Sequence, residues 1–172
     1  MKNNVLFILL FTSTFIFSQH INTRFIAVDK GATEKFEKGV AKKTKTFNSK
    51  EGQLRFYTFQ VNTGSNMGNY MRVRYEDEMK GFDVNPSKEA MKLWNAEVSD
   101  IMTNMDGRMQ SLNKNASHVV VSPFSKPLRT VMEYTYKGGM SDEFWRFRNN
   151  VAKAVKESGA DIFMEVWGCA SG

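Results

Sequence analysis

Two arginines at alternate positions of one predicted strand are the side chains that best suit ligand binding. The strand spans Tyr70–Glu76. Because alternate residues of a strand share a face, Tyr70, Arg72 and Arg74 lie on one side of it. Two arginines on one strand face indicate that the face meets an anion or water. Two interpretations remain open: Arg72 and Arg74 line a ligand pocket, or they point to solvent from an open sheet.

Aromatic residues on other predicted strands supply walls for such a pocket. Tyr57 and Phe59 alternate on the preceding strand, and Glu165 and Trp167 share a face near the carboxyl terminus. Aromatic walls with a few charged groups are the usual composition of a small-molecule site. The candidate ligand-binding residues are therefore Tyr57, Arg72, Arg74, Glu165 and Trp167.

Catalysis has less support, because the sequence contains no complete catalytic motif. A cofactor-independent oxygenase or isomerase would need an acid or a base, and Glu133 and Glu165 are the candidates. The only histidines, His20 and His118, form no metal-ligand pattern with Cys169. The sequence therefore indicates no metal and no cofactor, and it favours a free thiol for its single cysteine. Whether the protein is an enzyme stays open.

The first eighteen residues have the layout of a secretory signal peptide. Lys2 supplies a positive start, Val5–Phe17 is mainly apolar, and the small Ser18 precedes Gln19. The apolar run is shorter than the about 20 residues that a membrane-spanning helix requires. We expect a mature chain that begins at Gln19, is secreted or periplasmic, and has no integral membrane segment.

The net charge of +6 becomes +5 when Lys2 leaves with the signal peptide. Most of the excess lies in a lysine-rich run over residues 30–50, which also contains acidic residues. The run suits either an anionic partner or the solvated face of one helix. We favour the solvated face, and export argues against nucleic acid as a partner.

Hydrophobic periodicity predicts a ferredoxin-like α+β unit over residues 19–125. Aromatic and β-branched residues indicate strands, two of them joined as a hairpin, at residues 24–29, 53–61, 70–76 and 118–122. One helix follows the first strand and another follows the third. The element order is therefore β-α-β-β-α-β.

Two amphipathic helices complete this unit. The first spans residues 34–47, with Thr33 as its cap, Phe36 directed inward and the lysines on the other face. The second begins with Asn85 as its cap and ends at Asp106-Gly107. Its apolar stripe consists of Met91, Trp94, Val98, Ile101 and Met105.

Residues 126–172 predict a partial second copy of the unit. A strand over 129–136, a helix over 142–157 capped by Gly159 and a strand over 162–167 echo the first β-α-β. The helix directs four apolar residues inward, namely Phe144, Phe147, Val151 and Val155. The remaining elements of a complete copy are missing, which would leave an open sheet edge. Either another chain completes this sheet, or the sequence is a shortened form of a longer one.

The chain resembles the dimeric α/β-barrel superfamily, which includes NIPSNAP-like and antibiotic-monooxygenase-like domains. Four features carry the resemblance: the strand Phe25–Val28, the turn Lys30-Gly31, the helix start Glu34–Glu37 and the aromatic hairpin Leu54–Tyr75. The chain is most similar to exported tandem members from Bacteroidetes-type bacteria. The resemblance implies two units whose sheets close into a barrel around a cavity, and we expect a homodimer. It implies no single activity, since members range from monooxygenases to heme-handling proteins.

Three functions are consistent with the sequence. The first is an exported protein that binds a small apolar or aromatic ligand in the barrel cavity. The second is a cofactor-independent oxygenase or isomerase that uses the same cavity. The third is a non-catalytic interaction module, whose open second sheet docks a partner.

Overall fold

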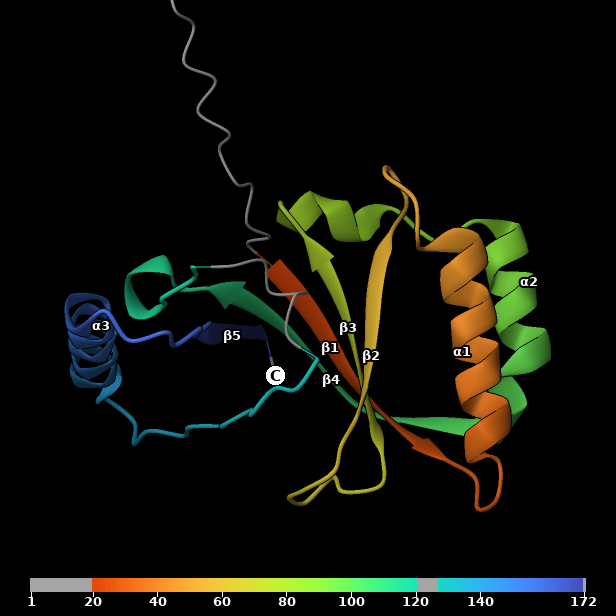
Figure 1. Cartoon of the computed structure of the whole chain (residues 1–172), viewed down its shortest axis with the longest axis horizontal. Coiled ribbons are helices and arrows are strands. Elements are labelled where there is room, and N and C mark those ends of the chain that lie inside the picture. Colours follow the sequence, from red (N-terminus) through yellow and green to blue (C-terminus); the bar gives the residue numbers. More distant parts are fainter. Residues whose placement is uncertain (1–19, 121–126, 172) are drawn as a thin grey trace, which may run out of the picture.

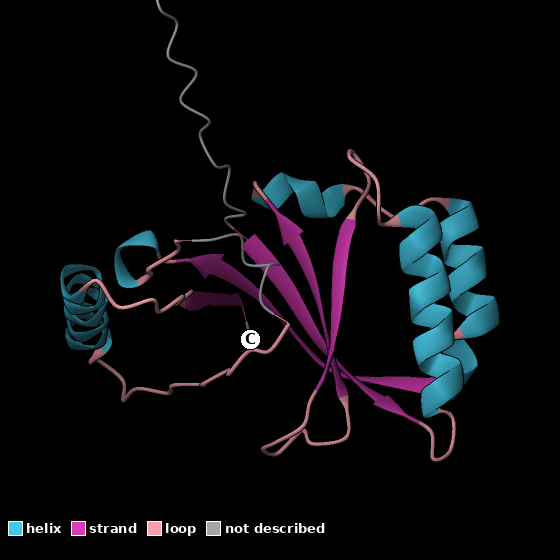
Figure 2. Cartoon of the chain, viewed as in Figure 1, coloured by secondary structure: helices cyan, strands magenta, loops and turns pink. Residues whose placement is uncertain are grey.

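A five-stranded antiparallel sheet forms the centre of the fold, and two helices cover one of its faces (Figure 1, Figure 2). The computed structural model describes residues 20–120 and 127–171. All neighbouring strands are antiparallel. The chain is thus an α+β protein, compatible with a ferredoxin-like fold. In sheet order the strands are β2 (Arg55–Gln60), β3 (Tyr70–Glu76), β1 (His20–Val28), β4 (Met102–Leu112) and β5 (Trp167–Ser171).

The predicted hairpin is confirmed, because β2 and β3 pair along the whole length of β2. β3 has the predicted bounds, whereas β2 is shorter than predicted at both ends. β1 begins at His20, earlier than predicted, because it pairs with β3 on one side and with β4 on the other. Hydrogen bonds on both sides hold this central strand in an extended conformation along its length.

Helix α1 (Thr33–Phe47) confirms the first predicted helix. Its cap is Ala32, which makes no side-chain hydrogen bond, so the prediction of Thr33 as the cap is wrong. Phe36 is fully buried against the sheet, as predicted. Lys43 departs from the prediction that the lysines lie on the solvent side, since it is only 3% exposed. One lysine of this helix therefore lies on its buried face.

The second predicted helix is wrong beyond Val98. Helix α2 (Lys88–Glu97) is capped by Ser87, whose hydroxyl accepts a hydrogen bond from the backbone of Ala90 at 3.1 Å, rather than by Asn85. A short 3-10 turn, η2 (Ser99–Ile101), then leads directly into β4. Long-range pairing with β1 thus overrides the local helical periodicity of this segment.

Three residues assigned to the end of that predicted helix lie within β4. Asp106 and Gly107 pair with β1 in the middle of the strand, so they do not terminate a helix. Met105 is the extra residue where the register with β1 shifts, and its side chain is exposed. A bulge of this kind explains why an apolar residue at helical spacing reaches solvent.

The predicted partial second copy contains its helix but lacks its predicted strands. Helix α3 (Ser141–Ser158) is confirmed, and Gly159 follows it with a φ of 66°, a left-handed conformation that suits glycine. Residues 129–136 form no strand, because no described segment pairs with them. A reader can follow this irregular segment in Figure 1, between η3 (Lys114–Ala116) and α3.

The predicted strands at 118–122 and 162–167 are reduced to one isolated bridge between His118 and Met164. Val121 and Ser122 lie outside the described residues. The strand that completes this end of the sheet is β5, which starts at Trp167 and pairs with β4. The fourth strand in sequence, β4, therefore ends before His118, whereas the predicted fourth strand began at His118.

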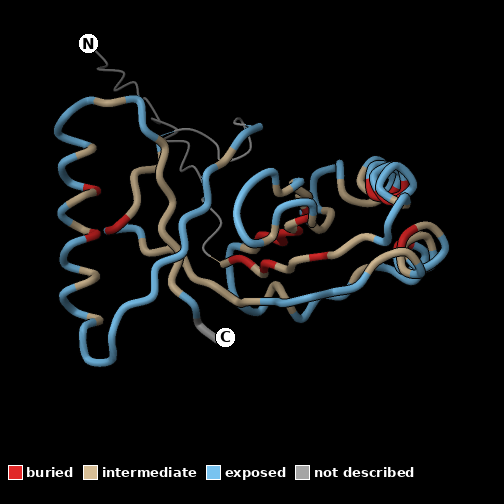
Figure 3. Tube along the Cα trace, turned by 90° about the horizontal axis from the view of Figure 1, so that it is seen from below, coloured by how far each residue is buried: buried red, intermediate tan, exposed pale blue. Residues whose placement is uncertain are grey.

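The C-terminal region exposes apolar side chains that the predicted elements would have buried. Phe147 is 59% exposed, so its predicted inward placement on α3 is wrong. Figure 3 shows few buried positions in this region of the chain. The exposed apolar segment, as we call it below, contains Leu128, Val131, Met132, Tyr134 and Tyr136.

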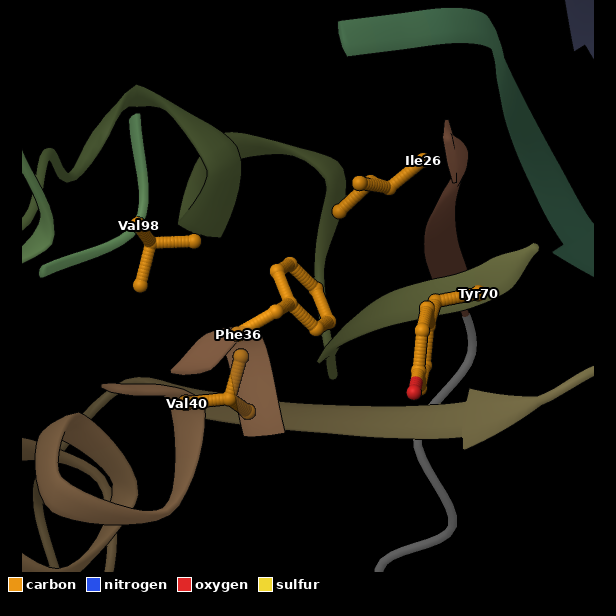
Figure 4. Close-up of a cluster of buried hydrophobic side chains, with 5 residues drawn as sticks. All are labelled: Ile26, Phe36, Val40, Tyr70 and Val98. Atoms are coloured by element: carbon orange, nitrogen blue, oxygen red, sulfur yellow. The ribbon is translucent and has the colours of Figure 1, made fainter. Parts of the chain in front are cut away.

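Two apolar clusters lie on opposite faces of the sheet. The cluster beneath α1 and α2 is drawn in Figure 4 and consists of Ile26, Phe36, Val40, Tyr70 and Val98. The other face buries Ile21, Val73 and Tyr75. Tyr70 and Tyr75 of one strand therefore face opposite ways, which confirms the predicted alternation of β3.

Candidate ligand-binding site

The structure divides the five predicted site residues between the two faces of the sheet. Arg72 and Arg74 lie on the helix-covered face, where both contact the ring of Phe56. Trp167 lies on the opposite face. Glu165 is placed with residues of that opposite face, as described below. Tyr57 belongs to the edge strand β2. Within the described part of the chain, no single pocket is lined by all five.

Arg72 is almost completely buried, with 2% of its surface exposed, and Arg74 is 8% exposed. The alternative that they point to solvent is therefore wrong. The Arg72 guanidinium lies 4.8 Å from the ring centroid of Phe56 and 4.7 Å from that of Trp94, and it donates a hydrogen bond to Thr58 Oγ1 at 2.6 Å. Burial and, to a smaller extent, repulsion by a neighbouring arginine lower the pKa of Arg72 to about 10.

Arg74 has a structural set of partners. Its Nε donates to Glu76 Oε1 at 2.6 Å, and its Nη2 donates to the carbonyl of Gly81 at 2.6 Å. Gly81 belongs to the 3-10 turn η1 (Met79–Asp83), which Arg74 thereby fastens to β3. Because its charge is paired, Arg74 is less suited than Arg72 to bind a ligand.

Lys43 joins Arg72 beneath the helices. Its Nζ lies 4.8 Å from the ring centroid of Phe56 and donates to Asn48 Oδ1 at 3.0 Å. The ring of Trp94 is 5.8 Å away. Burial, then the positive charges of Arg72 and Arg24, lower the pKa of Lys43 to about 8.

Arg24 completes a group of three cations, which we call the cation cluster: Arg24, Lys43 and Arg72. Arg24 pairs with Arg72 across β1 and β3. Burial and, to a smaller extent, Arg74 lower the pKa of Arg24. None of the three forms an ion pair with a carboxylate among the described residues. Buried charges are normally paired, so this cluster is an unusual concentration of positive charge.

A groove of about 580 Å³ lies beside the cation cluster, between α1 and β2. Val40, Ala41 and Thr44 of α1 form one side of it. On the other side lie Phe56, which contacts the cations, and Thr58, which holds Arg72. The groove therefore combines an apolar surface with access to Thr58, which is hydrogen-bonded to the buried guanidinium of Arg72.

Two hydrogen-bonded polar groups mark the same groove. The hydroxyl of Tyr70 donates to Glu37 Oε1 at 2.6 Å, and both residues line the groove. Burial, followed by the hydrogen bond and charge of Glu37, raises the pKa of Tyr70 to about 12. Tyr70 thus remains a neutral donor at physiological pH, and Glu37 provides a carboxylate at the mouth of the site.

The opposite face of the sheet holds an aromatic cluster. The Tyr57 and Tyr75 rings meet edge to face at 5.5 Å, and the Tyr75 and Trp167 rings at 6.3 Å. Arg129 donates to the Tyr75 hydroxyl at 3.3 Å and pairs with Glu165 at 3.6 Å. Burial raises the pKa of Glu165, while Arg129 and a hydrogen bond from Trp167 oppose that rise. The cluster brings three predicted site residues together: Tyr57, Glu165 and Trp167.

The two candidate acid–base residues have different environments. The side chain of Glu165 is 10% exposed and pairs with Arg129, and a raised pKa is the change that a general acid requires. Glu133 is exposed and pairs with Arg108, so it has the environment of a surface carboxylate. The structure thus gives only one of the two candidates an environment suited to proton transfer.

Cys169 is an exposed free thiol in a second groove, of about 630 Å³, near Trp145 of α3. His20 Nδ1 lies 2.9 Å from the hydroxyl of Ser111, and His118 joins the bridge to Met164. Within residues 20–120 and 127–171, no three potential metal ligands come together. Over the same residues, no helix has the length and apolar character needed to cross a membrane.

Four charged residues of these sites were not predicted from the sequence: Arg24, Glu37, Lys43 and Arg129. Lys43 follows Phe36 by seven positions and Val40 by three, and this helical phase places it on the apolar face of α1. Arg129 carries no such signal, because its partners come from distant segments of the chain.

The geometry presents one apolar groove beside the cation cluster and, across the sheet, an aromatic cluster with a half-buried ion pair. Comparison with known proteins adds no identity to this description. No protein-family model matches the sequence, and no curated protein matches it either.

Proposed function

We propose that this protein binds a small, mainly apolar or aromatic ligand in the groove between α1 and β2. The observation that carries the proposal is the groove itself, whose volume is about 580 Å³. Small-molecule sites span about 300–1,000 Å³ and combine apolar walls with a few polar groups. Val40 and Phe56 supply the apolar walls, and Tyr70 and Thr58 supply polar groups.

Binding is proposed in preference to catalysis because of where the candidate acid lies. Glu165, whose pKa burial raises, belongs to the aromatic cluster on the face opposite the groove. A ligand in the groove would therefore be separated from this carboxylate by the sheet. Proton transfer requires a side chain within hydrogen-bonding distance of the reacting group.

A titration with the neutral fluorescent probe N-phenyl-1-naphthylamine tests the proposal. Ala41 is exposed and lines the groove, so Ala41→Trp fills the space without changing charge. We expect this variant to bind the probe at least about tenfold more weakly than wild type. A tenfold change is a loss of about 1.4 kcal/mol of binding free energy.

Lys35→Trp is the matched control, because Lys35 is exposed on the same helix and does not line the groove. It should bind the probe as wild type does. Wild-type binding that survives Ala41→Trp unchanged, or a wild type that binds no probe, contradicts the proposed site.

We also propose that the chain is an exported member of the dimeric α/β-barrel superfamily and acts as a homodimer. The order β2-β3-β1-β4, with antiparallel neighbours, is that of a ferredoxin-like β-α-β-β-α-β unit and supports the proposal. Residues 126–172, with α3, would form the partial second unit. The signal-like first eighteen residues support export.

A further inference from the structure

We propose that the ligand carries an anionic group, a carboxylate or a phosphate, which binds to Arg72 and Lys43 behind Phe56 and Thr58, the residues through which the groove wall contacts these cations. This inference rests on the proposed function and specifies the chemical class of its ligand. An apolar molecule that binds in the groove does not by itself require the cation cluster.

The first step is the electrostatics of the cluster. Lys43 is 3% exposed and Arg72 is 2% exposed, and neither pairs with a described carboxylate. The rings of Phe56 and Trp94 stabilise each cation through cation–π contacts. Those rings do not remove the repulsion between the cations, which is stronger in a buried site than in water. An oxyanion would compensate it directly.

The second step is geometry. The ammonium of Lys43 and the guanidinium of Arg72 each lie 4.8 Å from the centroid of the same ring, that of Phe56. The charge of Arg72 also contributes to lowering the pKa of Lys43, so the two cations are close enough for one oxyanion between them to interact with both. Phe56 is also a wall of the groove, so it provides a surface against which the body of the ligand can stack.

The third step is access from the groove. Thr58 lines the groove, and its hydroxyl accepts a hydrogen bond from Arg72 at 2.6 Å. An oxyanion that enters beside Thr58 can take over this hydrogen bond and give the guanidinium an acceptor of opposite charge. Arg74 does not compete for the anion, because Glu76 and the carbonyl of Gly81 already accept its hydrogen bonds.

The experiment compares two probes of the same shape, 2-naphthoate and the neutral 2-naphthamide, by calorimetry at pH 7. We expect 2-naphthoate to bind at least about tenfold more tightly than 2-naphthamide, because hydrogen bonds between a cation and a carboxylate are stronger than those to a neutral amide. Arg72→Gln and Lys43→Gln should each remove most of this preference. Arg55→Gln and Lys35→Gln, at exposed positions of β2 and α1, should leave it intact.

The outcomes separate this inference from the proposed function. Equal binding of the two probes overturns the anion site and leaves the apolar groove standing. If neither probe binds, the anion site and the proposed groove site are both overturned. A preference that persists in Arg72→Gln and Lys43→Gln also overturns the assignment to these residues.

A measurement on the wild-type protein avoids any dependence on how the variants fold. Burial and the charges of Arg72 and Arg24 lower the pKa of Lys43 to about 8. A bound anion should raise it, and NMR titration of the Lys43 side chain with saturating 2-naphthoate measures the change. An unchanged Lys43 pKa in the presence of the bound probe overturns the inference.

Discussion

At the scale of single residues, Lys43 has a large effect on stability because its charge is buried without a carboxylate partner. Its pKa is lowered from 10.5 to about 8 in the folded protein. Between these two values the unfolded chain binds more protons than the folded chain. The free energy of unfolding therefore rises with pH across this interval. As the pH falls again through about 8, Lys43 becomes protonated in the folded protein and this increase is lost.

Lys43→Met should accordingly stabilise the protein in chloride buffer at pH 7. Replacing a buried charge by an apolar side chain of similar length removes the desolvation cost, and we expect a gain of about 1–3 kcal/mol. The gain should shrink at pH 9.5, where the wild-type amine is mainly neutral. Urea denaturation at both pH values measures it, with the exposed Lys35→Met as the control. A variant less stable than wild type at pH 7 contradicts this account.

At the scale of elements, α2 shows how a cap and a strand partner set the ends of a helix. Ser87 satisfies the backbone amide of Ala90 at the start. At the other end Val98 adopts a φ of −131°, outside the helical range, and β4 soon pairs with β1. The amphipathic stripe continues past this point in the sequence, but the strand pairing decides the structure.

Ser87→Ala should therefore destabilise the protein by about 1 kcal/mol, the usual cost of losing a serine N-cap. Asn85→Ala should change stability by much less, because Asn85 is exposed and precedes the cap. Thermal or urea unfolding of the two variants provides the comparison. A larger loss of stability for Asn85→Ala than for Ser87→Ala would show that Asn85, and not Ser87, caps the helix.

At the scale of the whole molecule, the exposed apolar segment is the surface that best supports a homodimer. Leu128, Val131 and Met132 are each exposed, and Phe147 of α3 adds a further exposed ring. Large exposed apolar side chains mark an interaction site where they gather into one patch. A second copy of the chain that covers this segment is consistent with the dimer we propose.

Val131→Asp should shift the protein from dimer to monomer at micromolar concentration, because a carboxylate would be buried at the interface. Met67→Asp is a matched control, since Met67 and Val131 are both 68% exposed and Met67 lies in the β2–β3 turn. Light scattering coupled to size-exclusion chromatography measures the mass. A wild-type monomer, or a dimer that tolerates Val131→Asp, argues against this interface and shifts support to a different partner.

The sequence by itself determined the elements whose signals are local. The helical phase of Phe36 and Val40 predicted α1, and the alternation of β3 correctly placed Arg72 and Arg74 on one face and Tyr75 on the other. Both periodicities follow from the backbone geometry of each element, and the αL glycine after α3 is a local feature as well. No tertiary contact is needed to read them.

Only the tertiary structure decided which surfaces are covered. Pairing of β4 with β1 ended α2 early, and the packing of α1 and α2 on the sheet buried Arg72 and Lys43. The sheet also separated Trp167 from the two arginines of β3. Pairing and burial depend on contacts between distant segments, and the energies of those contacts exceed the local preferences that a sequence pattern expresses.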